Sequence, residues 1–377
     1  TRTVIEMQFI VKRDILLKSL NFVQGVVEKK NTLPILSNVL LELKDNKLSI
    51  VATDLDIVFY DEISEVKILK EGSTTTSAAI LYDILRKISS NSELNFDLKT
   101  ENKLSLKSDN SDFNLLCLPI DNFPTFSDEF EGSEIALNNK RFLKLLNKTK
   151  IAISNDDTRH YLNGVFLHLT EAHGRNFLTG VATDSHRLSS SSLEIESAND
   201  FSSLILPRKT VFQLCSLLTE SAEKLSMKIS ENKIQFTLGK IKLISKVIDG
   251  KFPDYKKVVP TNNEKSLVVS SKDFINSIER VASVSLDRKE GVKLVINKDH
   301  VQLSVNSANS GEGNEKINAE FSSESLNISF NSKYLIDIAS EIEHKSLKMN
   351  LKDSVSPVLI EDISDKNSYY VIMPMKI

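Results

Sequence analysis

Apolar and polar residues alternate in short runs along this chain, a pattern typical of half-buried β-strands. One such run covers 39–43, and a second follows at 48–50 after a polar turn. The same pair of runs recurs twice, at 165–169 with 177–179 and at 292–296 with 301–305. The pattern therefore predicts one antiparallel hairpin that is repeated three times along the chain.

A short motif and a set of helices strengthen this repeat. Val51-Ala52-Thr53-Asp54 recurs unchanged at 181–184, which is 130 residues later. Apolar residues at helical spacing predict one amphipathic helix before each hairpin and another after it. The predicted helices cover 11–30, 78–88, 138–153, 207–218, 271–284 and 331–343.

Each repeat is about 124 residues long, close to the commonest domain size. We therefore predict an α+β fold with three repeated domains, at 7–131, 132–260 and 261–377. In each domain two helices pack on antiparallel sheets, and residues 1–6 form an extension ahead of a start at Met7. The alternative is one irregular enzyme with accidental internal similarity. The shared order and spacing of helices and strands in all three copies favour the repeat.

The distribution of charge is more informative than its total. Hydrophobic residues make up 40% of the chain and charged residues 26%, as in folded globular proteins, and the net charge is −3. This total excludes a strongly basic nucleic-acid binder. However, the six predicted helices together carry +9, which leaves −12 elsewhere. A face that gathers these helices would attract a polyanion, although the helices of the third repeat do not follow the trend.

Motifs for catalysis and for metal binding are scarce. The chain contains neither a phosphate-binding glycine loop nor an H-E-x-x-H motif, and its two cysteines stand in apolar runs, as core residues of a reducing compartment do. Asp184-Ser185-His186 has the residue types of a catalytic triad, but adjacent strand residues point to opposite faces. Two alternatives stay open: a metal-dependent nuclease using Asp54, Asp56 and Asp184, or a peptide-binding scaffold without DNA.

The two ends of the chain add a location and a candidate surface. The chain has neither a signal peptide nor an apolar run long enough to span a membrane, so we expect a cytoplasmic protein. Residues 369–377 are apolar almost to the last position. A final strand over 369–372 is compatible with an adaptable surface for partners at 373–377, because methionine side chains repack easily.

Several motifs, in this order, resemble the bacterial DNA polymerase III beta subunit, the family of replication sliding clamps. They stand at 32–38, 161–164, 181–188, 206–209, 249–255 and 371–375. The resemblance implies three clamp domains per chain and a head-to-tail homodimer that forms a six-domain ring around double-stranded DNA, without sequence preference. It implies an accessory subunit with no active site, metal or cofactor, although the family can carry the nucleotidyltransferase label of the polymerase holoenzyme.

The resemblance also implies partners and site residues. The partners are the polymerase III alpha subunit, the clamp loader delta subunit and repair polymerases, whose short peptides bind between the second and third domains. The expected peptide pocket consists of Leu162, Thr183, His186, Arg187, Leu188, Pro253, Val258, Val371, Met373, Pro374 and Met375. Ser185 and Pro357 depart from the family pattern at its edge.

Two further sets of residues complete these expectations. The matched positions Lys30, Arg208 and Lys209, together with the basic helix residues Lys140, Arg141, Lys144 and Lys148, are expected to contact DNA. Phe113 and Leu115 of one copy are expected to meet Ser283 and Val284 of the other at the dimer interface.

Overall fold

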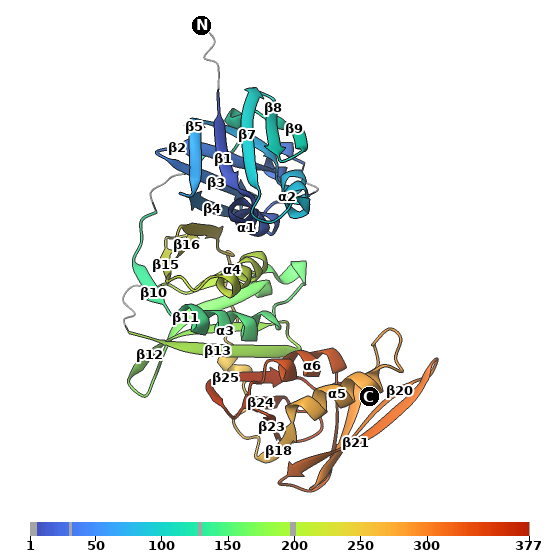
Figure 1. Ribbon diagram of the computed structural model, residues 1–377. Coiled ribbons are helices and arrows are strands. Elements are labelled where there is room, and N and C mark those ends of the chain that lie inside the picture. Colours follow the sequence, from blue (N-terminus) through green and yellow to red (C-terminus); the bar gives the residue numbers. More distant parts are fainter. Residues whose placement is uncertain (1–5, 30–31, 127–129, 197–200, 377) are drawn as a thin grey trace. The chain divides into compact units, whose positions relative to one another are not determined.

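A computed structural model describes residues 6–29, 32–126, 130–196 and 201–376 (Figure 1). All six predicted helices are present, and each repeat has the same order: strand, helix, strands, helix, strands. Residues 1–5 of the expected extension lie outside the described residues. The α+β fold with three repeats is thus confirmed.

The elements of the three repeats have the following bounds. The first repeat contains β1 (Gln8–Lys12), α1 (Arg13–Gln24), β2 (Asn38–Lys44), β3 (Lys47–Thr53), β4 (Ile57–Ile63), β5 (Val66–Lys70), β6 (Gly72–Ser77), α2 (Ala78–Lys87), β7 (Glu93–Thr100), β8 (Lys103–Ser108) and β9 (Ser111–Leu118). The second contains β10 (Glu134–Leu137), α3 (Asn139–Lys150), β11 (Gly164–Ala172), β12 (Arg175–Thr183), β13 (Arg187–Ile195), β14 (Leu204–Pro207), α4 (Arg208–Glu220), β15 (Leu225–Ile229), β16 (Lys233–Leu238) and β17 (Ile241–Lys246). The third contains β18 (Lys265–Ser270), α5 (Ser271–Ala282), β19 (Val292–Ile296), β20 (His300–Ser307), β21 (Gly311–Phe321), β22 (Leu326–Phe330), α6 (Ser332–Ser340), β23 (Ser346–Leu351), β24 (Val358–Asp362) and β25 (Asp365–Ile372).

The chain divides into two compact units, and the division passes through the second repeat. One unit comprises 1–139 with 212–247, and the other comprises 140–211 with 248–377. Each unit is built on one continuous sheet, of 13 strands in the first and 12 in the second. In the first unit β17 pairs with β4, and in the second β25 pairs with β13. Neighbouring repeats are therefore joined strand to strand.

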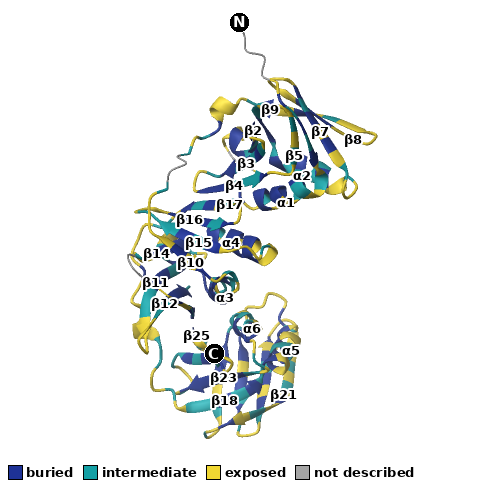
Figure 2. Cartoon of the chain, turned by 60° about the vertical axis from the view of Figure 1, so that its left-hand side comes forward, coloured by how far each residue is buried: buried dark blue, intermediate teal, exposed yellow. Residues whose placement is uncertain are grey.

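Helices cover these sheets with their apolar faces. In the first repeat α1 packs against α2, and it buries Leu16, Leu20 and Val23 completely. In the third repeat α5 packs against α6 and buries Phe274 and Ile278 in the same way. Figure 2 shows the buried residues gathered where helices and strands meet. Burial of these side chains removes apolar surface from water, which is the main favourable contribution to folding.

Candidate partner-peptide surface and DNA-contacting residues

The turn between β12 and β13 holds four of the expected pocket residues close to the carboxyl-terminal strand. The Asp184 carboxylate accepts hydrogen bonds from the backbone nitrogens of His186 at 2.9 Å and Arg187 at 3.0 Å. The Thr183 hydroxyl donates to the carbonyl of Arg187 at 2.7 Å. Asp184 and its neighbours thus form a hydrogen-bonded turn, which accounts for their place in the repeat without any catalytic role.

Ser185 stands in this turn at a position whose backbone conformation favours glycine. Its backbone is in the left-handed region, with φ of +77°, where residues other than glycine are strained. Its hydroxyl accepts a hydrogen bond from Arg159 at 2.6 Å, and Arg159 also donates to Asp156 at 3.0 Å. These contacts hold the serine side chain at the edge of the turn.

Arg187 links the second repeat to the third. Its guanidinium donates to Asp337 at 2.7 Å and to Asp184 at 3.3 Å, and it lies 4.3 Å from the centre of the Tyr334 ring. Only 9% of Arg187 is exposed, so the charge is held in a fixed geometry. Tyr334, which also stacks on His186, and Asp337 were not predicted from the sequence.

Three of the expected pocket residues lie beneath the surface. Leu162, Leu188 and Val371 are 2–3% exposed, and they pack with Phe252 and Tyr255 in one apolar cluster. Leu188 and Val371 are directly paired on β13 and β25. These side chains therefore form a floor, and a bound partner would contact the residues above them.

Besides His186 in the turn, the exposed members are apolar residues from two segments. Val258 is 55% exposed and Met373 is 41% exposed, and Pro253, in the linker before Val258, is exposed as well. Pro374 and Met375 are half-buried. Exposed apolar side chains around a fixed polar turn are typical of sites that bind short apolar segments.

Backbone hydrogen bonds hold the carboxyl-terminal segment in place. The nitrogen of Met373 donates to the carbonyl of His186 at 2.9 Å, and that of Met375 donates to the carbonyl of Ser329 at 2.7 Å. Met375 lies against Gly291, where an added Cβ would come within 2.9 Å of its sulfur. The final strand is confirmed, because β25 ends at Ile372. Residues 373–376 after it lie on the surface, and their contact with partners stays a prediction.

An aromatic cluster fixes the linker that carries Pro253 and Val258. Phe166 stacks on Phe252 with ring centres 4.8 Å apart, and the His168 ring is hydrogen-bonded to the Tyr255 hydroxyl at 2.8 Å. Burial lowers the pKa of His168 to about 4, so the imidazole is neutral at pH 7. The linker is thus held by packing and one neutral hydrogen bond.

The basic residues of α3 differ in how far they face solvent. Lys140 and Arg141 are exposed. The Lys144 ammonium lies 3.2 Å from Glu343 and 3.5 Å from Asp365. Burial alone would lower the pKa of Lys144, but Asp365 and Glu343 outweigh it and raise that pKa. The charge of Lys144 is therefore largely neutralised within the protein.

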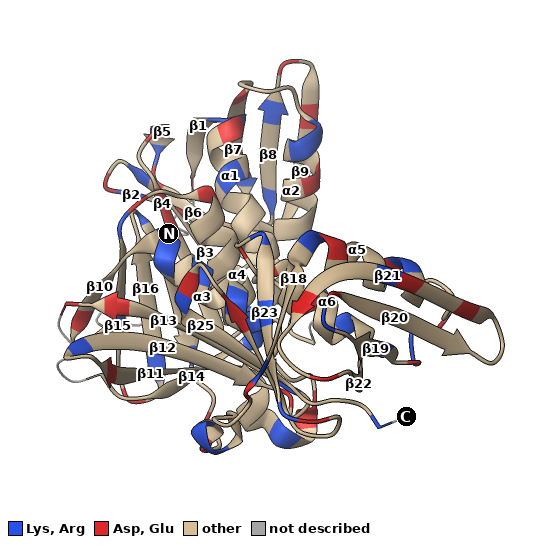
Figure 3. Cartoon of the chain, turned by 90° about the horizontal axis from the view of Figure 1, so that it is seen from below, with Lys and Arg blue, Asp and Glu red and all other residues tan. Residues whose placement is uncertain are grey.

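The assignment of Lys148 to DNA contact is wrong. Only 2% of this residue is exposed, and its ammonium lies 2.7 Å from Asp365 and 3.7 Å from Asp362. The side chain points to carboxylates of the third repeat rather than to solvent. Lys148 is therefore part of a structural ion pair. Figure 3 shows that the helices carry acidic as well as basic residues.

The other expected DNA residues stand at the start of α4 and in an earlier loop. Arg208 begins α4 and is exposed, and Lys209 follows it half-buried. Lys30 lies outside the described residues. Their contact with DNA stays a prediction.

The expected interface residues are only partly at the surface. Leu115 is 6% exposed and belongs to the core of the first repeat, whereas its neighbour Leu116 is 74% exposed. Phe113 and Val284 are half-buried, and Ser283 is exposed. Because strand residues alternate between faces, Leu116 is the outward side chain of this pair. Sequence reasoning missed it because both positions are leucine.

The residues of the nuclease alternative have local structural roles. The Asp54 carboxylate accepts from the nitrogens of Asp56 and Ile57 at 2.9 and 2.7 Å, as Asp184 does in its own turn. Within the described part of the chain, no three His, Cys, Asp or Glu side chains form a group that could hold a metal ion. No helix among the same residues has the length and apolar character needed to cross a membrane.

Comparisons with protein families identify all three repeats. Residues 7–127, 136–254 and 256–376 match the N-terminal, central and C-terminal domains of the DNA polymerase III beta subunit. The beta sliding clamp of Caulobacter vibrioides strain NA1000 is 35% identical over 373 residues, which cover 98% of this chain and 100% of the relative. That of Escherichia coli K12 is 33% identical over 371 residues, with the same coverage.

Solved structures give the same result. The Caulobacter crescentus beta sliding clamp with bound PEG has a TM-score of 0.94 at 35% identity and covers both chains fully. The Bartonella birtlesii clamp bound to griselimycin has a TM-score of 0.94 at 38% identity, covering 99% of this chain and 100% of its own. Beta sliding clamps are non-catalytic processivity factors of the polymerase III holoenzyme. The chain therefore belongs to the DNA polymerase III beta subunit family, the beta sliding clamps.

Proposed function

We propose that two copies of this chain form a ring that encircles duplex DNA and tethers the replicative polymerase. The observation that carries the proposal is the pairing of neighbouring repeats, β4 with β17 and β13 with β25. In both cases the fourth strand of one repeat pairs with the last strand of the next. The same pair of strands therefore joins each repeat head-to-tail to the next.

The same rule supplies the junction between copies. The strands left over are β21 of the third repeat and β9 of the first. Among the described residues, β9 pairs with β8 along its length but with β6 only at Cys117 and Leu118. β21 likewise pairs with β18 only over 319–321. We infer that β21 of one copy pairs with β9 of the other, and that two such heterologous contacts close a six-domain ring.

The proposed contact with DNA is electrostatic and independent of sequence. Lys140, Arg141 and Arg208, with Lys30 and Lys209, are retained as candidates because phosphate contacts need only cationic side chains. Few such contacts suit a ring that slides, since base-specific contacts would fix its position on the duplex. Closure of the ring, rather than affinity, then keeps it on DNA.

The proposed partner site is the apolar surface formed by Val258, Met373, Pro374 and Met375 over its buried floor. Short peptides of the polymerase III alpha subunit, the clamp loader delta subunit and repair polymerases would bind there. The polar turn at His186 and Arg187 would fix their orientation. The Bartonella birtlesii clamp has been crystallised bound to griselimycin, which supports a ligand-binding surface in this chain.

The remaining expectations belong to the same proposal. We retain domain limits at 7–131, 132–260 and 261–377, and a cytoplasmic location where the replication machinery works. A peptide-binding scaffold without DNA is the second candidate, because the apolar surface alone would serve it.

Retention on circular DNA tests the proposal. The protein is loaded onto nicked circular DNA with a clamp loader and ATP, and the complex is passed through a sizing column in moderate salt. A ring stays bound to the circle and is released when the circle is linearised. Equal retention on both forms of DNA contradicts topological binding, and no retention on either favours the scaffold.

A further inference from the structure

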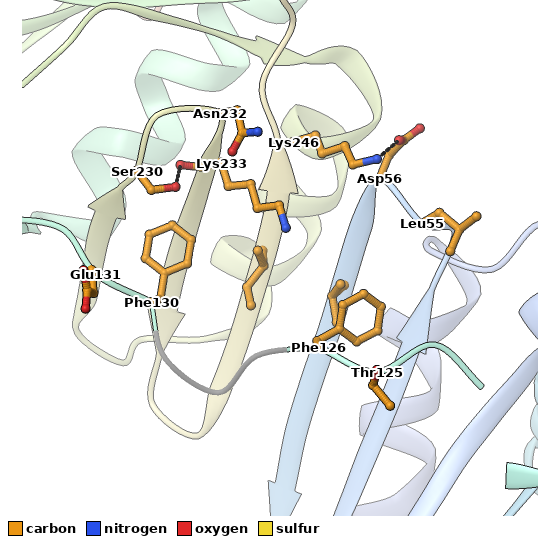
Figure 4. A pocket seen from close by; sticks show the side chains of 12 residues that line it. Leu55, Asp56, Thr125, Phe126, Phe130, Glu131, Ser230, Asn232, Lys233 and Lys246 are labelled. Carbon is orange, nitrogen blue, oxygen red and sulfur yellow. Dashed lines mark hydrogen bonds and ion pairs between the residues drawn. The ribbon is translucent and has the colours of Figure 1, made fainter. Parts of the chain in front are cut away.

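A cavity lies at the junction of the first and second repeats, within the first compact unit. It has a volume of about 590 Å³, inside the range of roughly 300–1,000 Å³ that is usual for ligand pockets. Its walls come from the turn after β3, from residues 125–126 and 130–131 after β9, and from the strands β16 and β17 (Figure 4). The apolar part of the lining is formed by Leu55, Val58, Phe126, Phe130 and Ile244.

The repeat relates this cavity to the proposed partner surface. Leu55 and Val58 follow the motif at 51–54 as Ser185 and Leu188 follow the identical motif at 181–184. Leu55 has φ of +81° and Ser185 has φ of +77°, so the two turns also share their unusual backbone. The two turns are therefore equivalent in sequence and in conformation.

The strand opposite each turn is equivalent as well. Ile244 of β17 pairs with Val58, just as Val371 of β25 pairs with Leu188. Two residues further along these strands stand Lys246 and Met373. The linker agrees too, because 123–126 reads Phe-Pro-Thr-Phe where 252–255 reads Phe-Pro-Asp-Tyr. The cavity thus occupies, at the first junction, the place of the partner surface at the second.

Leu55 is a strained and exposed residue at the edge of this cavity. Leucine adopts the left-handed backbone only with strain, and 44% of this residue stays in contact with solvent. Burial of the Leu55 side chain does not offset this backbone strain, and such uncompensated strain is typical of functional sites. An apolar side chain held open beside a cavity is suited to contact a ligand.

The charges distinguish this cavity from the partner surface. Lys246 is paired with Asp56 at 3.5 Å. The Lys233 side chain extends between Phe130 and Phe126, while Glu131 lies on the far side of Phe130 (Figure 4). Of the residues that the structure describes, no carboxylate lies within ion-pair distance of the Lys233 ammonium. A cavity whose apolar wall of leucine, valine, isoleucine and phenylalanine stands beside such a cation complements a ligand with apolar side chains and a carboxylate.

We propose that this cavity binds an extended acidic peptide segment in which leucine or phenylalanine side chains flank a carboxylate. The inference rests on the proposed function, because it assumes that the second junction binds peptides and that the equivalent first junction does so as well. The apolar side chains enter between Leu55 and Phe126, and the carboxylate pairs with Lys233. Each chain then has two peptide sites of different charge preference.

Fluorescence anisotropy with the labelled peptide Asp-Leu-Asp-Leu-Phe tests the proposal on the full chain. A variant lacking 373–377 removes the partner surface, and its thermal unfolding is compared with the parent to establish that it folds. We expect this variant to keep one peptide site. In that background Lys233→Glu weakens binding at least tenfold. Lys224→Glu, at the opposite end of β15 and about 20 Å from Ser230, changes it less than twofold.

Leu55→Gly provides a second variant that should fold. Glycine tolerates the left-handed backbone, so its melting temperature should not fall, while peptide binding to the first junction should be lost. No binding to the 373–377 deletion, or equal binding by Lys233→Glu and Lys224→Glu, overturns the inference. If the deletion leaves wild-type affinity and Leu55→Gly abolishes it, the first junction is a site and the proposed partner surface is wrong.

Discussion

The ammonium of Lys148 lies 2.7 Å from Oδ2 of Asp365, and it joins helix α3 of the second repeat to strand β25 of the third. Both side chains are buried, at 2% and 6% exposure. Burial alone would raise the pKa of Asp365, but hydrogen bonds from Lys148 and Ser368 outweigh it and lower that pKa to about 2. The carboxylate is therefore ionised at neutral pH, and the ion pair fixes this junction.

Loss of Lys148 should destabilise the chain strongly. Lys148→Met takes the nearest cation from the buried carboxylates of Asp362 and Asp365 and leaves only Lys144, at 3.5 Å from Asp365, which costs roughly 3–5 kcal/mol. Urea unfolding at pH 7 measures the change in the free energy of unfolding. Lys140→Met on the same helix is the control, and should shift it by less than about 0.5 kcal/mol because Lys140 is exposed.

A rescue experiment separates the charge effect from lost packing. Asp365→Asn in the Lys148→Met background removes one buried charge that has lost its nearest cation, so the double variant should be more stable than Lys148→Met alone. If the double variant is less stable, the lysine contributes through its hydrocarbon chain and the ion-pair account is incorrect.

His168 should make the protein sensitive to mild acid. Its pKa is about 4 in the folded chain against 6.5 for an unperturbed histidine, so the unfolded state takes up a proton first as pH falls. The stability that the neutral imidazole contributes is fully present above about pH 6.5 and decreases as pH falls toward 4. Between pH 7 and pH 5 the loss is about 2 kcal/mol.

A variant that does not titrate should lose this dependence. His168→Gln keeps a group that can hydrogen-bond to Tyr255, and the difference between its unfolding free energies at pH 7 and pH 5 should be about 2 kcal/mol smaller than in the parent. Equal pH dependence in both proteins would place the acid sensitivity elsewhere.

Local periodicity explains why the fold could be predicted well from the sequence. The apolar spacing of residues such as Leu16 and Ile278 reports which side of a helix is buried, and it predicts all six helices. The spacing of residues does not indicate which side chains point toward another repeat. Lys148 and Lys140 have the same residue type on one helix, yet only Lys140 of these two faces solvent.

Long-range pairs were out of reach for a related reason. Arg187 was expected in the partner site, but Tyr334 and Asp337, which fix its guanidinium, are about 150 residues away along the chain. No local pattern links these positions. The correct strand face was also ambiguous at Leu115 and Leu116, because adjacent leucines give no alternation.

Gly291 should be required for the position of Met375. An alanine there would bring its Cβ within 2.9 Å of the Met375 sulfur and 3.0 Å of the Phe330 carbonyl oxygen. Gly291→Ala should cost about 1–3 kcal/mol through overpacking and weaken partner-peptide binding about tenfold. Thermal unfolding and peptide anisotropy measure the two effects. In a Met375→Ala background the added methyl group should cost less stability, and an unchanged cost would assign the strain to Phe330 alone.

Leu116, rather than Leu115, should control dimer formation. Leu116 is 74% exposed on β9, whose free edge we propose to pair with β21 of a second copy. Leu116→Asp places a charge in that junction, and light scattering should then give a mass near 42.3 kDa instead of about twice that value.

Leu69→Asp, at 47% exposure on the edge strand β5, should leave the dimer intact. Leu115→Asp should instead unfold the first repeat, because it buries a charge in the core. A dimer that survives Leu116→Asp at micromolar concentration would contradict the proposed pairing of β9 with β21.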